Sequence, residues 1–155
     1  SAMLDRLLRT LRDRAGEPVG ALPERLTDVI ATAPPEVRKL VDLLVTREAS
    51  LSLGWREVEP DYFGSLADTW GQVSDDTGDH DPREAELLRS VQIGSSAGGE
   101  VYFGLCWGPA GIQMAEIDFE EGHIAWFESV QAFFEHVRDD EARRGETPPD
   151  LALLF

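Results

Sequence analysis

The chain of 155 residues contains a single cysteine, one lysine and no asparagine. One thiol cannot form an intrachain disulfide, and Cys106 lies inside a predicted strand, so we expect a buried, unreactive side chain. No apolar run approaches the roughly 18 residues that a membrane-spanning helix needs. We interpret Ser1-Ala2-Met3 as a remnant of tag removal. Nothing marks the chain for secretion, so we expect a cytoplasmic protein.

Basic residues are also scarce. The chain has 14 lysines and arginines against 30 aspartates and glutamates, which gives a formal net charge of −16 at pH 7. A surface of this charge repels nucleic acid phosphates and anionic membranes, so we expect neither as a partner. It speeds the encounter with a basic protein, although acidity can also serve solubility alone. The charge thus leaves two interpretations open, a basic protein partner or a solubilising surface.

The N-terminal part of the chain has the apolar spacing of amphipathic helices. A helix is predicted over residues 4–14, where leucines recur at helical spacing. A second helix is expected to begin near Pro23 and to end before Pro34-Pro35, because proline suits a first helical turn and stops a preceding helix. The same two prolines open a third helix, whose apolar face reaches Val45.

Residues 91–137 have the clearest pattern, and the rest of the predicted fold is organised around them. Four apolar runs alternate like strands with one buried face and are separated by short breakers, which predicts an antiparallel meander. Its strands are expected at 91–93, 101–107, 112–119 and 123–127. Ser129 offers an N-cap for a helix over 129–140.

The remaining segments complete a single α+β domain over residues 1–155. A strand is expected between Ala49 and Trp55, whereas residues 61–73 fit either a helix or an irregular aromatic segment. Residues 74–86 are polar, acidic and broken by glycine and proline, which predicts a surface loop. The last five residues are apolar and should dock on the body. We therefore predict N-terminal helices, a mostly antiparallel sheet of about five to six strands, and a C-terminal helix packed on the sheet.

The motif Gly94-Ser95-Ser96-Ala97-Gly98 matches the G-x-S-x-G pattern of hydrolase nucleophile elbows. The elbow needs a helix directly after it, whereas the next element predicted here is a strand. His123 or His136 could supply a histidine partner, but the chain is short for that fold. We therefore favour a hairpin connection over a catalytic Ser96 and expect no enzymatic activity. No phosphate-binding motif accompanies these glycines.

The acidic segment supplies the oxygen ligands that calcium prefers, but it does not fit a calcium-binding loop. Counted from Asp75, His80 takes the place of the required glycine and Pro82 that of an apolar residue. The three histidines and the cysteine have none of the spacings of zinc sites. We therefore predict neither a metal nor a cofactor. The tryptophans have mostly core-facing spacing, though a tryptophan can also anchor a partner.

The order of parts in residues 91–137 resembles the SUKH superfamily, which includes the Smi/Knr-type regulators and many bacterial immunity proteins. The resemblance rests on Val91-Gln92-Ile93-Gly94, the Gly98-Gly99-Glu100 turn, the strand and hairpin that follow, and the lead-in Phe127-Glu128-Ser129 to a helix with Phe133-Phe134. In the family, a helix opened in this way packs across the sheet.

The resemblance implies binding without catalysis. Bacterial members typically neutralise a cognate toxin, often a nuclease, by covering its active surface. An acidic inhibitor meets such a basic enzyme at an increased rate. We therefore expect an immunity protein that binds a basic toxin through an acidic face. The residues expected at this face are Asp75, Asp76, Asp79, Asp81 and Trp107. The alternatives are a regulatory interaction module without a toxin partner and, less favoured, a small serine hydrolase.

Overall fold

Three helices precede the sheet, as the proline positions and the apolar spacing predicted. The computed structural model describes residues 1–60 and 64–155. The helices are α1 (Ala2–Arg14), α2 (Glu24–Val29) and α3 (Pro35–Val45). Ser1 caps α1 by accepting a hydrogen bond from the backbone N–H of Leu4, and Met3 is buried. The residues interpreted as a tag remnant therefore belong to the first helix and its cap.

Six antiparallel strands form one sheet in the order in which they occur along the chain. β1 (Leu51–Ser52) and β2 (Arg56–Val58) replace the single strand expected at 49–55. The chain turns between them at Gly54, whose φ of 92° favours glycine. The predicted four-stranded meander is confirmed as β3 (Ser90–Ser96), β4 (Val101–Gly108), β5 (Gly111–Asp118) and β6 (His123–Phe127).

β3 is longer than the sequence predicted, because Gly94 is part of the strand and not of the turn. Gly94 pairs with Val58 on one side and with Phe103 on the other. A Cβ at this position would collide with the Phe103 ring and with the carbonyl oxygen of Glu57. Glycine is therefore needed here for close packing within the sheet.

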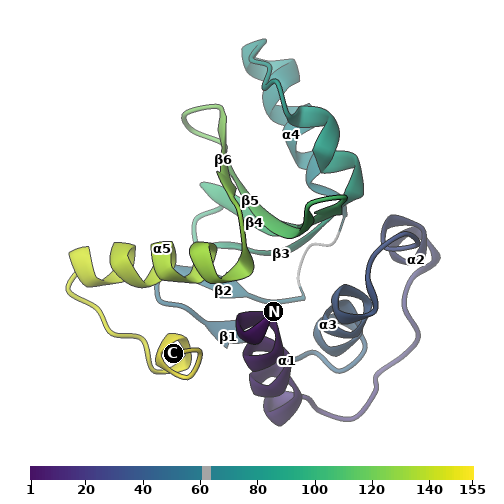
Figure 1. Cartoon of the computed structure of the whole chain (residues 1–155), viewed down its shortest axis with the longest axis vertical. Helices are drawn as coiled ribbons and strands as arrows, with labels where there is room; N and C mark the ends of the chain where they lie inside the picture. The colour runs from purple at the N-terminus through teal and green to yellow at the C-terminus, as the bar shows by residue number, and fades with distance from the viewer. Residues whose placement is uncertain (61–63) are drawn as a thin grey trace.

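The sheet lies between two layers of helices (Figure 1). One face packs against α5 (Val130–Arg143), with α1 and α3 beside it, and holds the larger core around Phe103 and Phe133. The other face carries α4 (Leu66–Thr77) and the short 3-10 helix η1 (Glu84–Arg89), with a smaller core around Trp70 and Ile117. The predicted α+β class and the C-terminal helix on the sheet are confirmed. Within the described ranges, no helix combines the length and apolar character needed to cross a bilayer.

The chain ends in a short helix, α6 (Pro149–Ala152), which docks on the body as predicted. Leu151 and Leu154 are buried in the larger core, whereas Phe155 remains partly exposed. The Asp150 carboxylate accepts a hydrogen bond from the backbone N–H of Ser52 and pairs with Arg14 at 2.6 Å. These contacts tie the C-terminus to β1 and α1.

For residues 61–73 the sequence left a helix or an irregular segment open, and the structure has a helix from Leu66 onward. Tyr62 and Phe63 lie outside the described residues. The prediction of a loop over 74–86 is wrong at both ends. Ser74–Thr77 form the last turn of α4, and η1 begins at Glu84. Ser65 caps α4, and apolar residues at helical spacing extend the helix into the acidic segment. The helix ends at Gly78, which has a left-handed conformation. The segment is at the surface, as predicted.

A buried arginine connects β2, β5 and α5. Arg56 is 3% exposed, and its guanidinium donates to both Glu116 carboxylate oxygens, at 2.7 and 3.0 Å, and to Asp140 at 2.9 Å. Burial disfavours the Asp140 charge, but the hydrogen bond and charge of Arg56, aided by the charge of Arg144, outweigh this effect. The pKa of Asp140 therefore lies below its usual value.

We predict that Arg56→Met lowers the free energy of unfolding by about 3–5 kcal/mol, because it leaves the buried Glu116 carboxylate without its cation. The measurement is urea denaturation at pH 7. Arg14→Met, which removes the cation from an exposed ion pair, should have a much smaller effect. The double variant Arg56→Met/Glu116→Gln should recover part of the loss.

The pH dependence provides a second check on the same group. A carboxylate with a lowered pKa stabilises the fold above its unfolded pKa of about 3.9, and this contribution is lost as the pH falls through the folded pKa. Arg56→Met should therefore show a shallower loss of stability in acid than the unchanged protein. An equal loss in both would contradict the role given to the Arg56–Asp140 pair.

Candidate functional site

Exposed carboxylates from two segments lie near one another at one end of the molecule, which we call the acidic tip. It combines the end of α4 and the segment after it with the turn between β5 and β6, both toward the top of the view in Figure 1. A Cβ added at Gly122 in this turn would lie 2.8 Å from the Asp79 carboxylate. The two segments are therefore in contact. The exposed carboxylates of the acidic tip are Asp75, Asp76, Asp79, Glu120 and Glu121.

The sequence pattern indicates only a break between two strands at Glu120-Glu121-Gly122 and gives no sign that this turn lies beside Asp79. Asp118 accepts hydrogen bonds at 2.9 Å from the backbone N–H groups of both glutamates and so holds the turn in shape. Asp118, Glu121 and His123 also bring one possible metal-ligand atom each within 4.8 Å of one another. Such groupings of exposed acids are common without an ion, so we assign no metal site.

Within the described residues, the basic side chains near the acidic tip mostly contact acids outside it, except His123, which lies 3.9 Å from Glu121. His80 contacts Glu84 at 3.0 Å, and Arg83 pairs with Glu86 at 2.6 Å, so both are engaged by acids outside the tip. The hydrogen bond and charge of Arg83 outweigh desolvation and keep the pKa of Glu86 below its usual value. The tip therefore presents a net negative surface to solvent.

Two of the five residues expected at the acidic face have structural roles. Asp81 accepts hydrogen bonds from the backbone N–H of Arg83 and from the Trp126 indole, which ties the segment to β6. Trp107 is 6% exposed and donates its indole N–H to Thr32 at 3.0 Å. The expectation of an exposed anchor is wrong at Trp107, because strand alternation turns its ring toward the larger core.

Ser96 of the hydrolase-like motif is held within the β3–β4 hairpin. It is 3% exposed; its hydroxyl donates to the Glu100 carboxylate at 2.7 Å and accepts from the backbone N–H groups of Glu100 and Val101. The element that follows is β4, a strand, as the sequence predicted. This arrangement makes Ser96 a stabilising residue of the turn.

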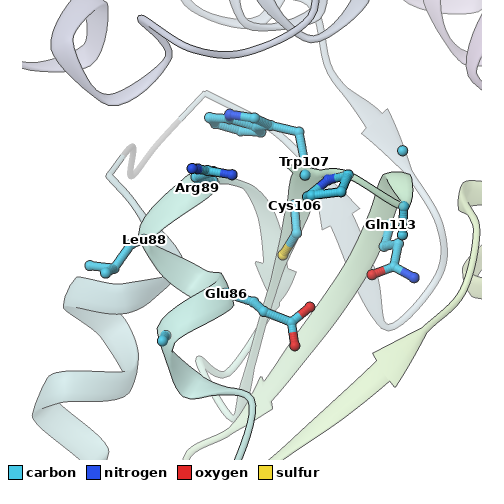
Figure 2. A pocket seen from close by; sticks show the side chains of 11 residues that line it. Glu86, Leu88, Arg89, Cys106, Trp107 and Gln113 are labelled. Carbon is cyan, nitrogen blue, oxygen red and sulfur yellow. The ribbon is translucent and has the colours of Figure 1, made fainter.

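Cys106 lies beside a cavity of about 350 Å³ between η1 and the β4–β5 turn. Figure 2 shows Cys106 and Trp107 on β4, Glu86 and Arg89 on η1, and Gln113 on β5 around this space. Burial, with a smaller effect of the Glu86 charge, raises the pKa of the Cys106 thiol to about 12. The thiol is therefore protonated at neutral pH and is a poor nucleophile, in agreement with the predicted buried, unreactive cysteine.

Comparison of the chain with family models, with curated proteins and with solved structures finds no match. Membership of the SUKH superfamily therefore stays a prediction.

We predict that Ser96→Ala lowers the free energy of unfolding by about 1–3 kcal/mol, because it removes the hydroxyl that satisfies two backbone N–H groups. Thermal or urea denaturation measures the effect. Ser52→Ala, at an exposed position on the edge strand, is the control and should be close to neutral. Unchanged stability of Ser96→Ala would show that its hydrogen bonds do not hold the hairpin.

We also predict that Cys106 reacts slowly with a thiol reagent such as DTNB in the folded protein. A pKa of about 12 in place of about 8.5 lowers the thiolate fraction at pH 8 on the order of a thousandfold. The reaction is followed by absorbance with and without denaturant. Rapid, complete reaction before unfolding would contradict the burial of this thiol.

Proposed function

We propose that this chain is a non-catalytic protein-binding domain of the immunity-protein type, which acts in the cytoplasm and neutralises a basic toxin by covering its active surface. The observation that carries the proposal is the acidic tip, where two segments in contact with each other carry five exposed carboxylates. The net charge of −16 supports it, because a strongly acidic protein attracts a basic partner at long range.

The support beneath the acidic tip also favours a binding role. Asp75 and Asp76 lie in the last turn of a regular helix, and Glu120 and Glu121 follow the aspartate that holds their turn. Charges on a firm backbone lose less conformational freedom on binding than charges on a free loop. A nuclease holds phosphates with lysine and arginine side chains, and exposed carboxylates can pair with the same groups.

The resemblance to the SUKH superfamily is consistent with this proposal. The features that carry it are the four-stranded meander, the glycine turn after β3 and the helix that begins after Ser129. The family implies binding without catalysis, and its bacterial members typically bind a toxin. The roles of Ser96 in a turn and of Cys106 as a buried thiol agree with a binding function.

We predict that the immobilised domain retains a basic enzyme from an extract of its source organism at low salt and releases it at high salt. A variant with the amides Asp75→Asn, Asp76→Asn, Asp79→Asn, Glu120→Gln and Glu121→Gln should lose this retention. The matched control removes five charges from the N-terminal helices and the segment between α1 and α2, through Asp5→Asn, Asp13→Asn, Glu17→Gln, Glu24→Gln and Asp28→Asn, and should keep it.

The retained enzyme is then assayed with and without added domain. Inhibition at a one-to-one ratio is expected for an immunity protein, because the proposed mode of action is occlusion of the active surface. Retention without inhibition would favour a regulatory module. Equal loss of binding in both charge variants would show that net charge acts alone and that the acidic tip has no special role.

A further inference from the structure

The sheet face that carries α4 is only partly covered by it. Glu57 on β2 lies directly opposite Ser95 on β3, and Ser95 lies opposite Tyr102 on β4. Directly opposed residues project from the same side of an antiparallel sheet. Tyr102 is in turn opposite Ile117, which packs in the smaller core under α4. The row from Glu57 to Tyr102 therefore lies on the α4 side, near the end of the sheet that holds the β3–β4 turn.

This row forms the floor of an open cavity of about 750 Å³. Thr69 and Gln72 of α4 line one side, and the β3–β4 turn and Phe119 line the others. None of the described residues that line it is basic, whereas two, Glu57 and Glu59, are acidic. The acidic residues of this cavity lie on β2 and just after it, whereas those of the acidic tip lie at the end of α4 and in the β5–β6 turn.

Glu57 is the residue that defines the chemistry of this cavity. Its side chain is half-buried, and the described part of the structure places no hydrogen-bond donor or cation on its carboxylate. A partly desolvated carboxylate without a partner favours a cation over a neutral or anionic ligand.

An aromatic pair lies across Ser95 from Glu57, at the β4 end of the row. The rings of Tyr102 and Phe119 pack with their centroids 5.0 Å apart and an interplanar angle of 60°. An aromatic face attracts a cation, and a guanidinium is suited to stack on a ring while its N–H groups reach a carboxylate. An ammonium group lacks this planar geometry.

We propose that the cavity receives an arginine side chain of the basic partner, with the guanidinium pairing with Glu57 and lying against the Tyr102 ring. The inference rests on the proposed function, in that the arginine belongs to a basic protein. The binding chemistry of the cavity can nevertheless be tested without that partner.

The test is a two-dimensional NMR titration of the isotope-labelled full chain with N-acetyl-arginine amide. Saturable shifts are expected at the backbone amides around Glu57, Ser95 and Tyr102. N-acetyl-citrulline amide, which has nearly the same shape and no charge, should leave these signals in place. N-acetyl-lysine amide should bind more weakly than the arginine compound.

Two variants and a matched control show whether the named residues hold the probe. Glu57→Gln keeps the size of the side chain and should abolish the shifts. Tyr102→Leu keeps the charge and should weaken binding several-fold. Asp76→Asn, which removes an equal charge from the acidic tip, should leave the titration unchanged. The spectrum of each variant without ligand shows whether that variant is folded, and the shifts on titration are measured from that spectrum.

The proposal is overturned if no saturable shift occurs, if the shifts centre on the acidic tip, or if Glu57→Gln or citrulline gives the same result as the arginine probe in the unchanged protein. This outcome is distinct from failure of the proposed function. Arginine binding in the cavity without retention of a basic enzyme would refute the function alone. Retention that depends on the acidic tip, without an arginine site, would refute the cavity alone.

Discussion

The arrangement of the sheet and of helix α5 depends on the contacts of one buried group, the guanidinium of Arg56. It is held by Glu116 from β5 and Asp140 from α5, so three elements distant in sequence meet at one group. Beside it, the Glu141 carboxylate accepts the backbone N–H of Trp55 and lies against Gly54, where any side chain would collide with it. Buried ion pairs of this kind add little net stability, but removing one partner is costly. They therefore favour the native packing over alternative packings that would separate the charges.

Fixing α5 on one face gives the two faces of the sheet different roles. The α5 face is filled by the larger core and is shielded further by α1 and α3. Among the described residues, the helices on the opposite face are α4 and η1, and beside them lies an open, negative cavity. The same helix α4 extends beyond the sheet and carries carboxylates to the acidic tip. Features that suit a partner are thus concentrated on the less covered side.

Local patterns predicted most of the elements correctly because short-range physics governs them. Alternation with glycine breakers located β3 to β6, and prolines located the starts of α2 and α3. Two wrong predictions have a common cause: contacts with residues far apart in the chain override the local sequence pattern. The loop expected at 74–86 is partly helical because an apolar stripe in contact with the sheet carries α4 past its acidic composition. Gly94 was assigned to a turn, yet the bulk of Phe103 requires it inside a strand.

The sequence by itself determined the α+β class, the order of the meander, the acidic character and the inert cysteine, since each follows from composition or from neighbours a few residues apart. Only the tertiary structure decided which charges lie together. In the folded chain Trp107 is buried, Asp81 accepts a hydrogen bond from the Trp126 indole, and Glu57 lines an open cavity. The turn with Glu120 and Glu121 contacts the segment after α4. These outcomes depend on contacts between residues far apart in the chain, and no local spacing records them.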